Sequence, residues 1–169
     1  MSTLTAATWV FALLLVVAGT GKVARPAATR PPSDERLARL LGAGEVGLGS
    51  VVLWIGGLVP TTLLAVAYAG FAVFTEHQRR RGRAYNCLSS TTTPPTTVHV
   101  WLNVTAAAVA AGAALRSGAS LPATVAAEPL HGLLVLGLLT VAAGLLRLLL
   151  TAAPDLSAAV ALVDPRNDA

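Results

Sequence analysis

A single carboxylate, Glu45, interrupts a long apolar stretch of the sequence within GAGEVGLGS. A charge inside an apolar helix is costly unless it is paired, and such residues often mark proton or ion pathways. Lys22 is the natural partner, because it ends the first apolar stretch while Glu45 lies a turn or two into the second, so antiparallel packing brings both to one end. The two residues predict an intramembrane charge pair that is either a proton- or quinone-handling site or a structural link between helices.

Cys87 is the candidate catalytic residue for thiol chemistry. It is the sole cysteine and follows the arginine-rich stretch RRRGR at residues 79–83, whose positive charge favours a thiolate. Thiol cycling within one chain needs a second cysteine to resolve the disulfide. We therefore expect Cys87 either to form a mixed disulfide with another protein or to be an incidental loop residue.

The sequence predicts no metal site and no bound cofactor. The spacing of the three histidines matches no metal-ligand pattern, and we expect His77 and His99 to be interfacial side chains; the third is His131. The AGTGK stretch at residues 18–22 lacks the earlier glycine and the following Ser or Thr of a phosphate-binding loop, since Val16 and Val23 stand there.

The elements that must position these residues are membrane helices. Of 169 residues, 54% are apolar and only 12% are charged, with a mean hydropathy of +0.69, whereas a soluble domain carries about a quarter charged residues. The net charge of +4 arises from basic residues in short loops, which argues against a nucleic-acid partner. We expect an all-α, polytopic helical bundle surrounded by the lipid bilayer.

Five transmembrane helices are expected, because about 20 apolar residues cross the hydrocarbon core. They are residues 4–23, a helical hairpin within 40–75 that turns at Gly56, Gly57 and Pro60, and residues 98–115 and 130–153. These give a four-helix core (1–117), an additional C-terminal helix (118–153) and a short polar tail (154–169). Small residues four apart are expected at helix contacts: Ala43/Gly47, Ala65/Ala69 and Ala106/Ala110/Ala114.

The distribution of basic residues predicts the orientation. Most of them lie in or beside the loops 24–37 and 76–97, and basic loops remain cytoplasmic. We expect a multi-pass protein of the cell membrane with its N-terminus outside and Cys87 on the cytoplasmic side.

The order of these motifs resembles the methylamine utilisation protein MauE family, which is related to DoxX-like membrane proteins. The resemblance covers about residues 4–115 and rests on AGTGK followed by Pro26, on GAGEVGLG and on Asn103. Lys22 falls on the family's Gly-x-x-Lys and Glu45 on its Glu followed by glycines, while Leu102 replaces the arginine that usually precedes the Asn.

The cysteine motif is reduced relative to the family. Where the family has Cys-x-Cys-Phe-Gly, this chain keeps only Cys87, with Tyr85, Leu88 and Ser89 at the other positions. The resemblance implies an accessory role rather than an enzymatic one, assisting the processing, transport or disulfide-linked maturation of a redox protein. In the namesake this is the small subunit of methylamine dehydrogenase, and a thioredoxin-like protein or a redox enzyme subunit is the implied partner.

Two alternatives remain open from the sequence. A DoxX-like subunit of a quinone-linked membrane oxidoreductase would use Lys22 and Glu45 to handle protons. A purely structural or transport subunit would show no dependence on Cys87.

Overall fold

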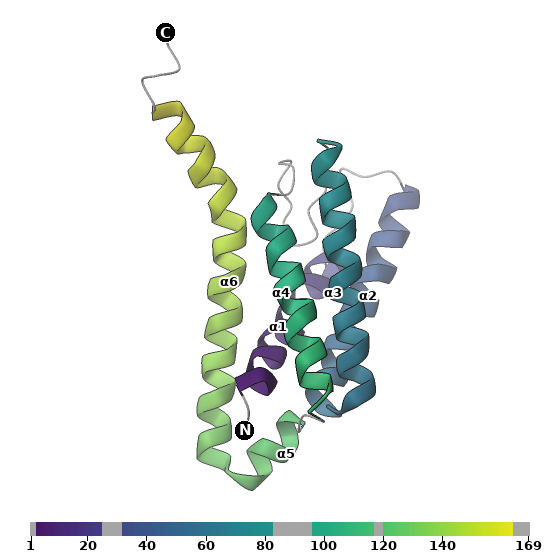
Figure 1. The fold of residues 1–169 in the computed structure, drawn as a ribbon, viewed down its shortest axis with the longest axis vertical. Helices are drawn as coiled ribbons and strands as arrows, with labels where there is room; N and C mark the ends of the chain where they lie inside the picture. The colour runs from purple at the N-terminus through teal and green to yellow at the C-terminus, as the bar shows by residue number, and fades with distance from the viewer. Residues whose placement is uncertain (1–2, 25–31, 83–95, 117–119, 164–169) are drawn as a thin grey trace.

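The computed structural model describes residues 3–24, 32–82, 96–116 and 120–163, and these residues form helices joined by short turns. Figure 1 shows the arrangement. The helices are α1 (Thr3–Ala24), α2 (Pro32–Trp54), α3 (Leu58–Arg80), α4 (Thr97–Ala114), α5 (Leu121–Ala127) and α6 (Pro129–Val163).

Four of these helices are long and apolar enough to cross a membrane: Thr3–Ala24, Arg36–Trp54, Leu58–Arg80 and Thr97–Ala114. Large apolar side chains such as Trp54, Trp101 and Leu115 are exposed on the outside of the bundle. Their exposure is favourable in lipid and unfavourable in water. The predicted all-α fold and its membrane-compatible character are confirmed at this level. The described part of α6 holds a shorter apolar stretch, Gly132–Leu146, so a fifth span stays a prediction.

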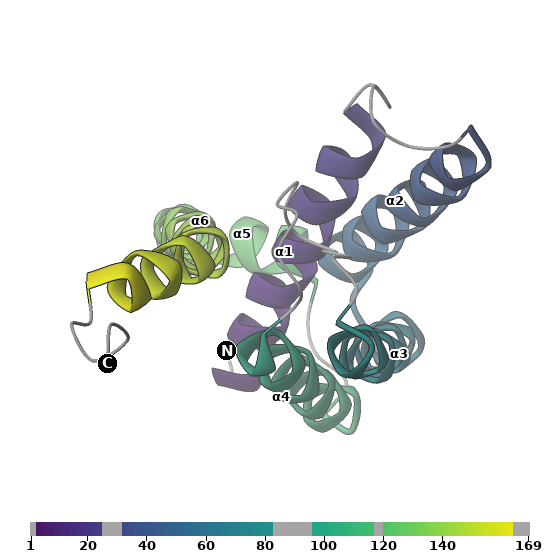
Figure 2. The same cartoon turned by 90° about the horizontal axis from the view of Figure 1, so that it is seen from above.

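The four long helices form two pairs. α1 packs chiefly against α2, and α3 packs chiefly against α4, while α2 and α3 contact each other much less although they are consecutive. Figure 2 shows the two pairs side by side, with α6 beyond α1. The predicted turn between α2 and α3 forms at Gly56 and Gly57, whose φ angles of 63° and 83° lie in the left-handed region that glycine tolerates best.

The apolar core lies where the pairs meet around α1. Its largest fully buried side chains are Trp9, Leu14, Val52 and Leu64. Tyr68 of α3 is also buried there, and its hydroxyl donates a hydrogen bond to the Phe11 carbonyl oxygen at 2.7 Å. The core therefore ties α3 to α1 as well as to α4.

The first part of the predicted tail, residues 154–163, is helical. α6 continues through Pro154 to Val163. A proline inside a helix removes one backbone hydrogen bond and bends the helix, but it does not always end it. The last turns of α6 lean away from the bundle (Figure 1). In addition, the short helix α5 lies within the stretch expected to be a loop between α4 and α6.

The helix directions bring most of the described basic residues to one end of the bundle. α1 and α3 end there, and α2 and α4 begin there (Figure 1). The described basic residues on these helix termini define what we call the basic end: Lys22, Arg36, Arg39, Arg79, Arg80 and Arg81.

Candidate functional site

Lys22 and Glu45 lie against each other at the contact between α1 and α2. The Lys22 Nζ donates a hydrogen bond to Glu45 Oε1 and forms an ion pair with it. The side chains are 15% and 6% exposed, respectively. The structure thus brings the two sequence-predicted residues together in a largely buried position close to the basic end.

Two glycines allow the helices to approach closely beside this pair. A Cβ added at Gly19 would lie 2.5 Å from the Gly42 carbonyl oxygen and 2.9 Å from the Glu45 Cβ. A Cβ added at Gly42 would lie 2.8 Å from the Gly19 carbonyl oxygen and 2.9 Å from the Lys22 Cβ. Small residues permit close contact between membrane helices where lipid supplies no hydrophobic drive, so these glycines bring the Lys22 and Glu45 backbones within reach of one another.

The expected small-residue contact on α2 is wrong. Ala43 and Gly47 are exposed, and the α2 glycines that pack against α1 are Gly42 and Gly49; a Cβ at Gly49 would lie 2.6 Å from the Ala12 carbonyl oxygen. Of the other expected positions, Ala69 is exposed, whereas the remainder are buried: Ala65, Ala106, Ala110 and Ala114.

Aromatic side chains of α3 complete the surroundings of the pair. Lys22 Nζ lies 5.8 Å from the centroid of the Phe71 ring, a distance at which a cation is attracted to the ring face. Phe71 packs edge-on against Tyr68, with ring centroids 6.0 Å apart. No sequence pattern pointed to these two aromatic residues, which only the packing of α3 brings to the site.

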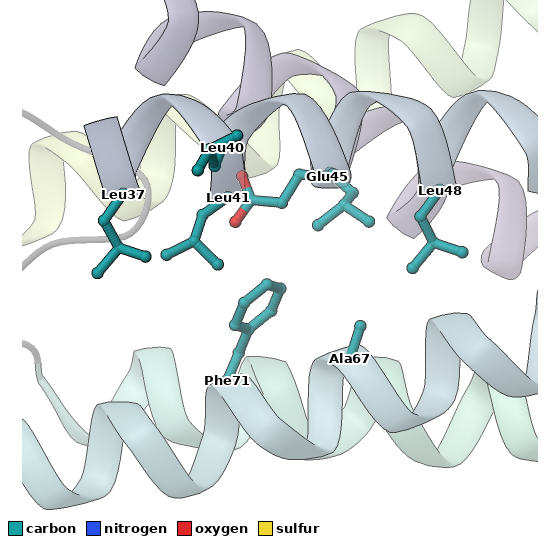
Figure 3. A pocket seen from close by; sticks show the side chains of 9 residues that line it. Leu37, Leu40, Leu41, Glu45, Leu48, Ala67 and Phe71 are labelled. Carbon is teal, nitrogen blue, oxygen red and sulfur yellow. The ribbon is translucent and has the colours of Figure 1, made fainter. Parts of the chain in front are cut away.

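A groove of about 290 Å³ adjoins the pair between α2 and α3. Figure 3 shows Glu45 on the α2 side beside Leu41, across the groove from Ala67 and Phe71 of α3. Oε2 of Glu45 is buried and has no hydrogen-bond partner among the described residues. The site therefore combines a paired carboxylate that keeps one acceptor oxygen free with an apolar groove, and it is able to accept a hydrogen bond from a ligand or to exchange a proton.

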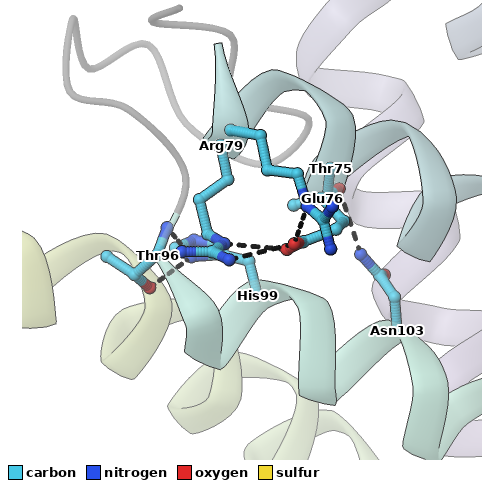
Figure 4. Close-up of polar contacts among 7 residues, drawn as sticks. Thr75, Glu76, Arg79, Thr96, His99 and Asn103 are labelled. Carbon is cyan, nitrogen blue, oxygen red and sulfur yellow. Dashed lines mark hydrogen bonds and ion pairs between the residues drawn. The ribbon is translucent and has the colours of Figure 1, made fainter. Parts of the chain in front are cut away.

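A second polar cluster links α3 to α4 near the basic end (Figure 4). Asn103, which carries part of the family resemblance, is 6% exposed and donates a hydrogen bond to Thr75 Oγ1 at 3.4 Å. Glu76 pairs with Arg79 and Arg80 on the exposed side of α3. This arrangement assigns Asn103 a contact between helices, and Thr75 is a partner that sequence patterns did not reveal.

His99 is buried at the start of α4, close to the basic end. It is 6% exposed, and its Nδ1 accepts a hydrogen bond from the Thr96 backbone N–H at 3.3 Å while lying 2.8 Å from Thr96 Oγ1. This is a capping box that begins α4, with His99 in the position usually taken by Glu or Gln. His77, in contrast, is exposed.

The structure does not describe two of the sequence candidates. Cys87 and the side chain of His131 fall outside the described residues. Within the part of the chain that the structure describes, no group of three or more His, Cys, Asp or Glu side chains is placed to hold a metal ion. Comparisons with protein-family models, with curated proteins and with solved structures find no match for this chain.

Proposed function

We propose that the chain is an integral membrane accessory protein of the MauE kind, which assists the processing, transport or disulfide-linked maturation of a redox protein. The observation that supports this proposal is the contact between the two motifs of the resemblance. Gly19 and Lys22 of AGTGK meet Gly42 and Glu45 of GAGEVG face to face. Motifs that lie 20 residues apart in the sequence thus form one packed unit, as expected if the four-helix core is the element that defines the family.

The reactive group in this proposal is Cys87, acting on a thioredoxin-like partner. Its thiolate attacks a disulfide of the partner, a new sulfur–sulfur bond forms between the two proteins, and the partner's second sulfur leaves as a thiolate. That thiolate later attacks the mixed disulfide, regenerates the partner's disulfide and releases Cys87. The exchange is electron-neutral, so this chain holds the partner without oxidising or reducing it.

The proposed orientation places the basic end in the cytoplasm of the cell and the N-terminus outside. The gathering of arginines and Lys22 at one end of the described bundle supports it, because lysine and arginine are retained on the cytoplasmic side of membranes. Loops 24–37 and 76–97, and with them Cys87, then face the cytoplasm. The partner is accordingly expected on that side of the membrane.

Trapping the mixed disulfide tests the proposal. Cells producing the full-length protein are quenched with acid, their free thiols are alkylated, and adducts are separated without reductant and identified by mass spectrometry. An adduct with a thioredoxin-fold or redox protein is expected for the native chain, and its absence would contradict the disulfide role. The matched control carries Cys87→Ser together with Ser89→Cys, which moves the thiol by two residues; an equally abundant adduct in this control would mean that Cys87 has no specific role.

A second candidate function is a subunit of a quinone-linked membrane oxidoreductase. The observation that favours it is the position of Glu45, whose side chain lines an apolar groove and keeps Oε2 free of hydrogen bonds from described residues. Glu45 and Lys22 would then pass a proton to or from a quinone. Glu45→Gln should abolish quinone-linked activity in a protein that still folds, and full activity in this variant would rule the candidate out.

A further inference from the structure

The groove between α2 and α3 opens toward the surroundings of the bundle. On the α2 side, Leu37, Leu40 and Leu41 line it and are 59%, 71% and 46% exposed. The groove exists because each of the two helices packs mainly on another partner, α2 on α1 and α3 on α4. In a membrane this opening faces acyl chains, so a molecule dissolved in the bilayer reaches the groove without passing through water.

Glu45 gives this otherwise apolar groove one polar contact point. Among the described residues that line it, Glu45 alone has a polar side chain; the others are leucines, Gly44, Ala67 and Phe71. Oε1 of Glu45 is taken by Lys22, whereas Oε2 is buried and has no partner in the described part of the chain. A buried acceptor without a partner is unfavourable, and a ligand that donates a hydrogen bond to it removes this cost.

The charge of the pair restricts what that ligand can be. Lys22 and Glu45 together are neutral, whether the shared proton lies on the amine or on the carboxyl group. A charged ligand would bring an unpaired charge into an apolar site, which is costly. The pair therefore favours an uncharged molecule that carries a hydrogen-bond donor, and a hydroxyl group is the simplest donor of this kind.

The size of the groove sets how much of the molecule it holds. Its volume of about 290 Å³ lies at the lower end of the range of ligand pockets, about 300–1,000 Å³. The groove thus accommodates a headgroup and the first part of a chain. The remaining apolar chain extends along the exposed leucines of α2 into the lipid.

We propose that the α2–α3 groove binds an uncharged membrane alcohol, with a long alkyl or isoprenoid chain, whose hydroxyl group donates a hydrogen bond to Glu45 Oε2. The apolar chain lies between the leucines of α2 and the Phe71 ring of α3. The proposal involves no reaction of Cys87 and no electron transfer. It therefore goes beyond the mixed-disulfide function, and it assigns to the groove a ligand that is neither oxidised nor reduced, unlike the quinone of the second candidate.

Photolabelling of the full-length protein in lipid nanodiscs tests the proposal. The probe is hexadecanol with a photoreactive diazirine in its chain, and the labelled peptides are identified by mass spectrometry. Labelling is expected on α2 between Leu37 and Leu48 and on α3 between Ala67 and Phe71. Unlabelled hexadecanol should compete for these positions about ten times better than hexadecyl methyl ether, which has the same chain and no donor; about 1.4 kcal/mol corresponds to tenfold.

A matched pair of glycine variants separates binding in the groove from partition into the lipid around α2. Gly44 lines the groove and Gly47 does not, yet both are exposed, and a Cβ at either would meet no atom within 4 Å. Gly44→Phe should fill the groove and reduce labelling at least tenfold, whereas Gly47→Phe should leave it unchanged. Ala67→Phe fills the groove from α3 and should also reduce labelling. It provides an independent test if Gly44→Phe folds poorly.

Three results would overturn the proposal. These are equal competition by the methyl ether, labelling spread evenly over the outward-facing helices, and equal loss of labelling in Gly44→Phe and Gly47→Phe. Since hexadecanol is neither oxidised nor reduced and does not involve Cys87, its failure to bind would leave the mixed-disulfide and quinone-linked functions to their own tests.

Discussion

Removing the charge from both Lys22 and Glu45 should destabilise the protein less than removing it from either residue alone. Lys22→Met leaves the Glu45 carboxylate, 6% exposed, without its cation, and Glu45→Gln leaves the Lys22 ammonium, 15% exposed, without its anion. An unpaired charge in such a position costs about 3 kcal/mol. The double variant contains no charge at this contact and loses only packing and one hydrogen bond, at a cost of about 2 kcal/mol.

The measurable quantity is the coupling energy of the double-mutant cycle. Independent effects would add to about 6 kcal/mol, so the expected cost of about 2 kcal/mol corresponds to a coupling of about 4 kcal/mol. Reversible unfolding of the full-length protein in mixed micelles, followed by helicity as the dodecyl sulfate fraction rises, gives the free energy of unfolding for the native chain and the three variants. Additive effects would refute the inference that the two charges stabilise each other.

An exposed ion pair of the same protein serves as the control. Glu76 and Arg80 pair on α3 with side-chain exposures of 26% and 76%, and exposed pairs of this kind contribute little to stability. The cycle formed by Glu76→Gln and Arg80→Met should therefore show no measurable coupling. Coupling as strong as that of the buried pair would mean that the measurement reports total charge rather than a specific contact.

Three further perturbations examine the packing and the orientation. Gly19→Ala should lower the free energy of unfolding by about 1–3 kcal/mol, because the new Cβ would lie 2.5 Å from the Gly42 carbonyl oxygen. Gly47→Ala places its Cβ in open space and should be neutral or slightly stabilising. Equal effects of the two substitutions in the same unfolding titration would argue against the close approach of α1 and α2. Tyr68→Phe removes the hydroxyl that donates to the Phe11 carbonyl oxygen and should cost about 1 kcal/mol, so an unchanged unfolding curve would show that this bond is not stabilising. In a Cys87→Ser background, a membrane-impermeant maleimide should label Leu58→Cys in intact cells and Arg81→Cys only after lysis, and the reverse pattern would invert the proposed orientation.

The sequence was sufficient to predict the helical class and the first four apolar helices, because their lengths follow from the apolar runs and from the glycines between α2 and α3. It was also sufficient to suggest the Lys22–Glu45 contact, since a charge in such a run requires a partner. The extent of α6 was not predictable in the same way. Pro154 is compatible with both a helix end and a bend inside a helix, and only the structure distinguishes the two.

The contact face of α2 illustrates what the small-residue spacing could not decide. Glycine and alanine recur so often in this helix that several faces satisfy a four-residue spacing. The position of Glu45 distinguishes these faces. Gly42 lies three residues before Glu45 and Gly49 four residues after it, so both share its helix face. Ala43 and Gly47 each lie two residues from Glu45 and are on the opposite face. The buried charge therefore identifies the face that packs.

No local sequence pattern predicts the groove between α2 and α3. It forms because consecutive helices are not each other's main partners, and this follows from the packing of all four helices together. The position of Phe71 over Lys22 and the burial of His99 have the same origin. Such features require the arrangement of α3 and α4 around α1.

The pairing of α1 with α2 also bears on how the protein is made. α2 is the helix with an acidic residue in its apolar stretch, and its counter-ion lies on the helix synthesised immediately before it. If the two helices entered a bilayer as one hairpin, Lys22 would already lie beside Glu45, and the insertion penalty of an isolated charge would be avoided. The order of the helices along the chain would then let the first helix assist the insertion of the second.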